Sequence, residues 1–231
     1  MPKLVPIVEG DGEVTAAPVL LYKLLAEMNR YDVQVAVPKN AHGRSNLQKP
    51  DGLERFLKHA WKERECGAVL ILLDAEGECP VTIARDFSRR AAALGLLHPV
   101  VIVCARRMYE AWFLASLETI AGKDLAGRTA LLDVPLPASD VESISNPKSV
   151  LNDRFPKGRI YKETEDQEAM TRLLDTTLAK ERSRSFRRLC HAVEQALKAI
   201  EAGAKIVTPS FAEEQNPPAP AAAEKRGKKR K

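Results

Sequence analysis

The sequence predicts an α/β protein with a mostly parallel central sheet of about four strands, flanked by helices. Short apolar runs of β type alternate with amphipathic helical stretches over about the first hundred residues, which is typical of this class. One of these runs, 68–73, is apolar throughout, as a central strand covered on both faces would be. Hydrophobic residues make up 45% and charged residues 29% of the chain, which indicates an ordinary globular composition.

The first half of the predicted fold follows a strand, helix, strand, helix order. Residues 4–8 are an apolar run that ends in Glu9-Gly10-Asp11-Gly12, and leucines at helical spacing then predict a helix over 14–29. The valine-rich run 33–37 predicts a second strand. A polar loop leads from it to a predicted helix over 51–64, in which Asp51 is a suitable N-cap.

The second half begins with the third predicted strand, 68–73, which ends at Asp74. Pro80 suits the start of a helix, and helical spacing follows over 83–94. A fourth strand over 99–104 leads into a helix over 108–120. Four later prolines indicate a loop-rich stretch, after which apolar periodicity predicts two closing helices over 166–178 and 185–202.

Three regions are expected along the chain: an α/β core over 1–122, a loop-rich and helical extension packed on it over 123–212, and a disordered basic tail over 213–231. The tail is rich in Pro and Ala and then in Lys and Arg. It holds six basic residues against three glutamates, so the formal net charge of +5 leaves about +2 for the remainder (5 − 3). Mild positive charge favours polyanions but does not distinguish DNA from RNA.

The composition also excludes some classes of protein. No run approaches the ~18 apolar residues of a membrane-spanning helix, and the N-terminus lacks the pattern of a signal peptide, so we expect a cytoplasmic protein with no membrane partner. The four cysteines form no CxxC pair and the histidines have no metal-type spacing. We therefore expect reduced, mostly buried thiols and no zinc site.

Acidic side chains follow the ends of two predicted strands. Glu9 comes directly after the first and Asp74 after the third, with Glu13 and Glu76 close by in sequence. The carboxyl ends of parallel strands meet at one edge of a sheet, where ligands bind, so these carboxylates are candidate ligands of Mg²⁺ or Mn²⁺. Taken singly, each is also a common turn former or helix cap.

Further polar residues are candidates for the same chemistry. Glu110 lies just beyond the fourth predicted strand. There it is either a further metal ligand or water-orienting group, or an acid in the first turn of a helix, where the helix dipole favours it. Lys148 and Lys162 could stabilise charge on a phosphate, or could be solvated loop lysines. The candidates for contacts to nucleic-acid phosphates, with charged helix faces as the alternative, are Arg106, Arg107, Lys162 and Arg187.

Val8-Glu9-Gly10 together with Asp74-Ala75-Glu76 resembles the signature of Toprim domains. These domains occur in topoisomerases, primases, recombination-repair proteins and the overcoming-lysogenization-defect nucleases. The resemblance implies a compact Toprim-like (Rossmann-like) sheet, a magnesium-binding glutamate at Glu9 and an Asp-x-Asp pair beginning at Asp74. The spacing from Glu9 to Glu13 is similar to the acidic pair of the nuclease branch. Glu76 departs from the signature, because it keeps the charge of the second aspartate but lengthens the arm.

Other motifs resemble a bacterial Toprim-like family of uncharacterised function that is encoded beside ABC-type or SMC-like ATPases in defence-type gene neighbourhoods. The motifs, within about 4–197, are Tyr109-Glu110-Ala111-Trp112, Asn146-Pro147-Lys148, Tyr161-Lys162 and Ser185-Phe186-Arg187. The resemblance implies a Mg²⁺-dependent nuclease acting on DNA or RNA with an ATPase partner. Its implied catalytic residues are Glu9, Asp74, Glu76, Glu110 and Lys148. Two alternatives stay open: a noncatalytic subunit that binds an ATPase and nucleic acid, and a nucleotide phosphohydrolase.

Overall fold

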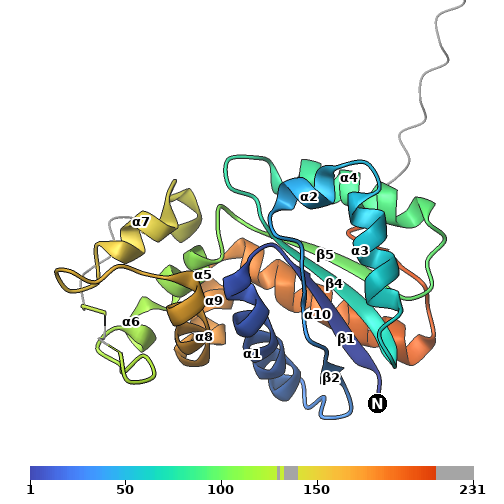
Figure 1. Cartoon of the computed structure of the whole chain (residues 1–231). Helices are drawn as coiled ribbons and strands as arrows, with labels where there is room; N and C mark the ends of the chain where they lie inside the picture. Colours follow the sequence, from blue (N-terminus) through green and yellow to red (C-terminus); the bar gives the residue numbers. More distant parts are fainter. Residues whose placement is uncertain (129–130, 133–139, 212–231) are drawn as a thin grey trace, which may run out of the picture.

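The computed structural model describes residues 1–128, 131–132 and 140–211 (Figure 1). These residues form a parallel sheet of six strands in the order β2-β1-β4-β5-β6, with β3 also paired to β1. Helices cover both faces of the sheet, so the predicted α/β class is confirmed. The basic tail predicted over 213–231 lies outside the described residues.

The long strands of the sheet are β1 (Lys3–Val8), β4 (Cys66–Asp74) and β5 (Val100–Ala105). They confirm the predictions for 4–8, 68–73 and 99–104. The remaining strands have two residues each and are β2 (Gln34–Val35), β3 (Lys39–Asn40) and β6 (Val207–Thr208). The run 33–37 therefore pairs over only part of its length, and β3 and β6 raise the strand number above the four expected, because pairs this short leave no periodic pattern in the sequence.

The helices before residue 116 are α1 (Asp11–Glu27), α2 (Arg44–Gln48), α3 (Gly52–Trp61), α4 (Pro80–Ala93) and α5 (Glu110–Ala115). The stretch that forms α2 was expected to be a loop. Pro80 is the first residue of α4, as predicted. Asp51 occupies the N-cap position of α3, as predicted, but its φ is +57° and its side chain makes no capping hydrogen bond.

The later helices are α6 (Leu117–Ile120), α7 (Pro147–Asn152), α8 (Glu163–Leu173), α9 (Thr176–Arg182) and α10 (Arg184–Ala202). The helix predicted over 108–120 is broken at Ser116 into α5 and α6. The helix predicted over 166–178 is likewise divided, because Asp175 caps a new helix by accepting a hydrogen bond from the Leu178 N–H. The prediction over 185–202 is confirmed by α10.

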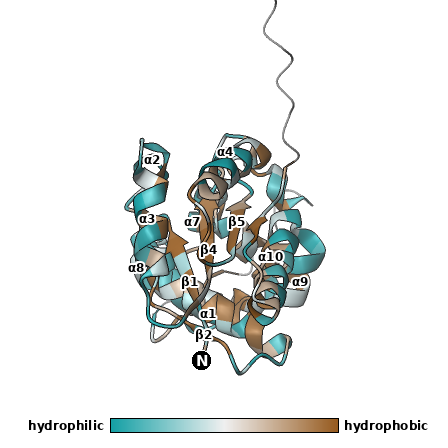
Figure 2. Cartoon of the chain, turned by 90° about the vertical axis from the view of Figure 1, so that its right-hand side faces the viewer, coloured by the Kyte–Doolittle hydropathy of each residue, from teal (hydrophilic) through white to brown (hydrophobic). Residues whose placement is uncertain are grey.

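Strand pleating divides the core into two layers. Even-numbered residues of β4, such as Leu70 and Leu72, pack with α1 and α10, whereas odd-numbered residues, such as Ile71 and Leu73, pack with α3 and α4. Figure 2 shows the hydrophobic strands enclosed by helices with hydrophilic outer residues. This burial on both faces explains why the sequence of β4 is apolar throughout.

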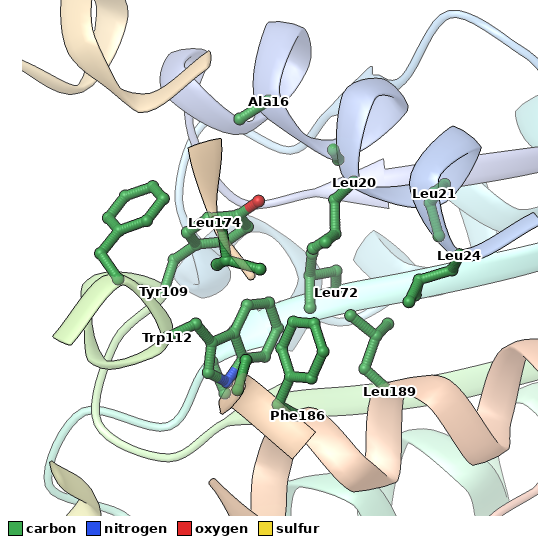
Figure 3. Packing of buried hydrophobic residues seen from close by; sticks show 14 of the residues in the cluster. Ala16, Leu20, Leu21, Leu24, Leu72, Tyr109, Trp112, Leu174, Phe186 and Leu189 are labelled. Atoms are coloured by element: carbon green, nitrogen blue, oxygen red, sulfur yellow. The ribbon is translucent and has the colours of Figure 1, made fainter. Parts of the chain in front are cut away.

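Aromatic side chains join the later helices to the sheet. Trp112 of α5 meets Phe186 of α10 edge to face, with ring centroids 5.3 Å apart, and Leu72 of β4 lies beside them (Figure 3). The Trp112 indole N–H donates to the Ser185 hydroxyl at 3.0 Å. Tyr109 completes the group from the start of α5 and is also fully buried. These contacts hold the N-terminus of α5 against the carboxyl end of β4.

None of the helices in the described ranges is long and apolar enough to cross a membrane. The thiols of Cys66, Cys104 and Cys190 are buried and that of Cys79 is exposed, all without disulfides, as expected.

Candidate functional site

The loops that follow the three long strands leave the sheet at one edge. β1 and β4 are parallel neighbours with Val8 opposite Leu72, and β4 and β5 pair in parallel as far as Asp74 opposite Ala105. The first and third predicted strands, which correspond to β1 and β4, are thus neighbours in the sheet. Acidic residues that follow these strands start from neighbouring positions in space, although they are far apart in sequence.

Glu9 connects the loop after β1 to two other segments. Its carboxylate accepts hydrogen bonds from the backbone N–H of Arg44, at 3.2 Å, and from that of Asp74, at 3.1 Å. The bond from Arg44, the first residue of α2, is the helix-terminal role that was weighed as the simple alternative, whereas the bond from Asp74 ties Glu9 to the end of β4. A carboxylate has about four lone-pair positions, so these two bonds leave capacity for another partner.

Asp74 lies at the centre of the acidic residues. Its Oδ1 accepts a hydrogen bond from the Tyr109 N–H at 3.0 Å. Burial raises the pKa of Asp74 well above its usual range, and the negative charges of Glu110, Glu13 and Glu9 raise it further. The side chains of four acidic residues therefore act on one another electrostatically at this edge.

Glu110 is the most enclosed of these residues, with 2% of its surface exposed. Burial raises the pKa of Glu110 to about 7, with a contribution from the negative charge of Glu163, while Lys148 and Tyr161 act in the opposite direction. Glu110 is also the first residue of α5, so it has the position of a first-turn helix acid, which was the alternative interpretation. Its burial distinguishes it from a solvated helix-terminal acid.

Glu13 has both a local and a shared role. Its Oε2 accepts a hydrogen bond from the Gly10 N–H at 3.0 Å, which caps α1. Burial raises the pKa of Glu13, and Glu163 and Glu9 add to the rise. Glu163 is the first residue of α8, whereas the sequence predicted that this helix starts at 166. Glu163 was therefore not identified as a site residue. The Tyr161-Lys162 motif just before it was the available sign that this segment belongs to the site.

We call the five residues that influence one another in this way the acidic cluster: Glu9, Glu13, Asp74, Glu110 and Glu163. Lys148, from α7, is the cation associated with it and forms an ion pair with Glu163. Burial opposes the charge of Lys148, but Glu163, Glu110 and Asp74 together raise the pKa of Lys148. The structure thus brings the predicted Glu110 and Lys148 to the same edge as Asp74.

Glu76 takes a different position from the other predicted acidic residues. It is exposed, has a φ of +49°, and lies 3.4 Å from Nη2 of Arg44. The same Arg44 nitrogen donates to Glu78 at 2.6 Å, and Nη1 donates to the main-chain carbonyl of Asp74 at 2.6 Å. The Arg44 side chain is only 9% exposed and its Nε has no partner among the described residues. Arg44 therefore holds the loop after β4, a role with no signal in the sequence beyond a basic residue in a polar segment.

The residues predicted to contact nucleic acid are mostly engaged within the chain. Arg107 donates to the Glu76 carbonyl at 3.3 Å, Lys162 pairs with Glu165 at 2.9 Å, and the Arg187 guanidinium donates to carbonyls at the end of α9. Arg106 lies in the loop between β5 and α5 and is half-buried. The structure brings Arg106 and Arg107 to the edge that carries the acidic cluster, while Arg187 lies on α10.

The acidic cluster supplies oxygen ligands alone, which suits a hard cation such as Mg²⁺ or Mn²⁺. Within the described part of the chain, no group of three or more acidic, histidine or cysteine side chains is arranged to hold a metal ion. The fit is therefore one of chemistry and placement alone. Burial is the main cause of the raised pKa values of Asp74 and Glu13, and the negative charge of neighbouring glutamates, which a cation would offset, adds to it. Glu9, Glu13 and Asp74 are the candidates by their chemistry and place, although as they lie in the described residues they do not form such a group.

Fold and site define a class: a parallel α/β protein with a cluster of carboxylates at the carboxyl edge of its sheet. Over residues 8–194 the chain matches the family described as a domain of unknown function, DUF4276. The match spans most of the chain, and the protein belongs to that family. No curated protein and no solved structure matches the chain.

Proposed function

We propose that this protein is a divalent-metal-dependent nuclease that hydrolyses phosphodiester bonds in DNA or RNA, using Mg²⁺ or Mn²⁺. The observation that carries the proposal is the convergence of the acidic cluster and Lys148 at one edge of the sheet from five separate segments of the chain. Isolated caps or turn residues need no such convergence. A site that binds a cation and a polyanionic substrate together does need several carboxylates and a lysine in one place.

In the proposed reaction each residue has a separate task. Glu9, Glu13 and Asp74 would hold the cation, which would supply Lewis-acid polarisation of a phosphate oxygen and a lowered pKa of bound water. Glu110, whose pKa is raised to about 7, exchanges a proton near neutral pH, either with the attacking water or with the leaving oxygen. Lys148 stabilises negative charge on the phosphate. Glu76 lies outside this set as placed, and its interaction with Arg44 gives it a supporting role in the loop.

A partnership with an ABC-type or SMC-like ATPase, a role in antiviral defence and residence in the cytoplasm belong to the same proposal. The partnership and the defence role are supported by the resemblance of the Tyr109-Glu110-Ala111-Trp112 and Asn146-Pro147-Lys148 motifs to the Toprim-like family described above. Residence in the cytoplasm is supported by the sequence, which has no apolar run of membrane-spanning length and no signal-peptide pattern. The Toprim relationship itself is part of the proposal.

A second candidate is a noncatalytic subunit that binds nucleic acid and the ATPase. The observation in its favour is that the side chains of Glu9 and Glu76 already have partners, in two backbone N–H groups and in Arg44 respectively. In this case the acidic cluster would be retained for the structure of the loops.

Cleavage assays separate the two candidates. Purified protein, with and without the ATPase, is incubated with plasmid, single-stranded DNA, RNA and transfer RNA in the presence of Mg²⁺ or Mn²⁺. We expect cleavage by the wild type, a loss of about 10²-fold or more in Asp74→Asn and Glu110→Gln, and no loss in Glu181→Gln, which changes an exposed acid of α9. Absence of cleavage under all conditions, or cleavage unchanged by these substitutions, would refute the nuclease.

Metal titration by calorimetry supplies the second readout. The nuclease predicts binding of Mg²⁺ or Mn²⁺ that is weakened in Asp74→Asn, whereas a folded protein without metal binding favours the noncatalytic subunit. Turnover of small nucleotides without polymer cleavage would instead indicate a nucleotide phosphohydrolase.

A further inference from the structure

A row of basic side chains on α3 takes no part in the proposed reaction. Arg55 and Lys58 of α3, and Lys62, the C-cap residue that follows it with helical backbone angles, are exposed. They recur at intervals of three and four residues, so they lie on one side of the helix. One surface hollow of about 430 Å³ is lined by Asp51, Glu54, Arg55, Lys58, His59 and Lys62. We call Arg55, Lys58, His59 and Lys62 the α3 basic face.

The positive charge of the α3 basic face is offset only in part within the described residues, where Lys58 acts electrostatically on Glu54. Glu54 is bound by the Arg90 guanidinium through two hydrogen bonds of 2.8 and 2.6 Å, and these hold its pKa below the usual range. No acidic side chain in the described part of the chain forms an ion pair with Arg55, Lys58 or Lys62, which leaves exposed Asp51 as the one unpaired acid of the hollow. The hollow therefore presents net positive charge to solvent.

Length and position suit a chain of phosphates. At 1.5 Å per residue, Arg55 and Lys62 are separated by roughly 10 Å along α3, which matches about three phosphate steps of 3.4 Å on one DNA strand. α3 follows and contacts α2, whose Arg44 donates to the Asp74 carbonyl at 2.6 Å (Figure 1). α2 thus connects α3 to the edge that carries the acidic cluster. A nucleic-acid strand bound along α3 would lead past α2 toward that edge.

We propose that the α3 basic face binds the sugar-phosphate backbone of a nucleic acid and holds it beside the acidic cluster. The assignment of the bound strand as a substrate rests on the proposed function, whereas the binding itself does not. Contacts to phosphates carry no sequence information, so binding is insensitive to sequence and strongly dependent on salt. Arg55, Lys58 and Lys62 are not among the four basic residues that the sequence analysis gave as candidates for phosphate contacts.

The test uses the full chain in EDTA, so that binding is measured without cleavage. Fluorescence anisotropy follows labelled single-stranded DNA, duplex DNA and RNA of equal length at several salt concentrations. The variant is Lys58→Glu/Lys62→Glu, and the matched control is Lys123→Glu/Lys198→Glu, which makes the same change of charge at exposed lysines elsewhere. We expect at least tenfold weaker binding in the first variant and a salt slope reduced by about 2, with little change in the control.

Neutral substitutions guard against a folding defect. Lys58→Gln/Lys62→Gln, checked by circular dichroism and thermal unfolding, is expected to weaken binding in the same direction. If both α3 variants bind with the affinity and salt slope of the control, the inference is wrong, whether or not the protein cleaves nucleic acid. Binding of an acidic protein through this face with no affinity for nucleic acid would also overturn it.

Asp74→Asn keeps this inference and the proposed function distinguishable. We expect it to bind the labelled nucleic acids normally in EDTA while losing cleavage in Mg²⁺. If Asp74→Asn cleaves like the wild type while the α3 variants lose binding, the proposed metal site fails and the α3 basic face stands.

Discussion

Replacing Glu110 by glutamine should stabilise the protein at alkaline pH. The Glu110 carboxyl is buried near Glu163, Lys148, Tyr161 and Asp74, and its pKa is raised from 4.5 to about 7, mainly by burial. A glutamine keeps nearly the same volume and cannot ionise. The substitution therefore removes the cost of holding a negative charge at this position.

The magnitude follows from proton linkage. Because the folded-state pKa lies above the unfolded one, the native protein binds more protons between pH 4.5 and about 7, and its free energy of unfolding falls as the pH rises through this window. At 1.36 kcal/mol per pH unit, the fall due to Glu110 is about 3 kcal/mol. Glu110→Gln should escape it and be more stable than the wild type by about that amount at pH 8. At pH 4 to 5 the two proteins should differ by less than about 1 kcal/mol.

Urea unfolding in EDTA at pH values from 4.5 to 8 measures this difference. In a thermal unfolding experiment, the same gain in stability at pH 8 would raise the Tm of a chain of this size by about 6–12 °C. Glu181→Gln, an exposed substitution, serves as the control and should leave the pH profile unchanged. If the stability of Glu110→Gln relative to the wild type is the same at pH 5 and pH 8, then ionisation of the Glu110 carboxyl does not destabilise the folded protein, and the reasoning is refuted.

Three further substitutions test other parts of the structure by urea unfolding at pH 7. Arg44→Ala removes the donors that hold the loop after β4 and should destabilise the fold by about 2 kcal/mol; full stability would mean that these hydrogen bonds contribute nothing. Phe186→Ala removes a fully buried ring that packs against Trp112 and should cost about 3–5 kcal/mol, whereas a loss below about 1 kcal/mol would contradict that packing. Gly12→Ala places a methyl group 2.0 Å from the Gln167 Oε1 atom and should cost about 1–3 kcal/mol, and a second substitution, Gln167→Ala, should recover part of the loss.

Periodicity predicted the long elements well. The β1, β4 and β5 strands and the α1, α4 and α10 helices have continuous apolar runs or stripes, and each was placed within a few residues of its observed bounds. The two-residue strands β3 and β6 were missed because their pairing depends on a neighbour rather than on their own pattern. The breaks at Ser116 and Asp175 were missed because the apolar spacing runs across them. At Asp175 a side-chain cap starts the next helix, whereas at Ser116 the backbone leaves helical geometry without a side-chain cap.

The candidate site shows the same division. Glu9 and Asp74 could be placed at one edge from the sequence, because both follow predicted strands of a mostly parallel sheet. That these two strands are neighbours was decided by the structure. Arg44 and Glu163 could not, since their roles depend on contacts to residues about thirty or more than one hundred positions away. A basic residue in a polar loop and a glutamate before a helix carry no local sign of such contacts.

The order of apolar runs, by itself, determined that this chain is a parallel α/β protein with acidic residues gathered at the carboxyl ends of its strands. The tertiary structure decided which carboxylates face one another: Glu76 lies beside Arg44, whereas Glu110 is buried with Lys148 and Glu163 nearby. The physical reason is that periodicity along the chain specifies which faces are buried. The desolvation and charge partners of a single carboxyl group are set instead by segments that become neighbours only when the chain folds.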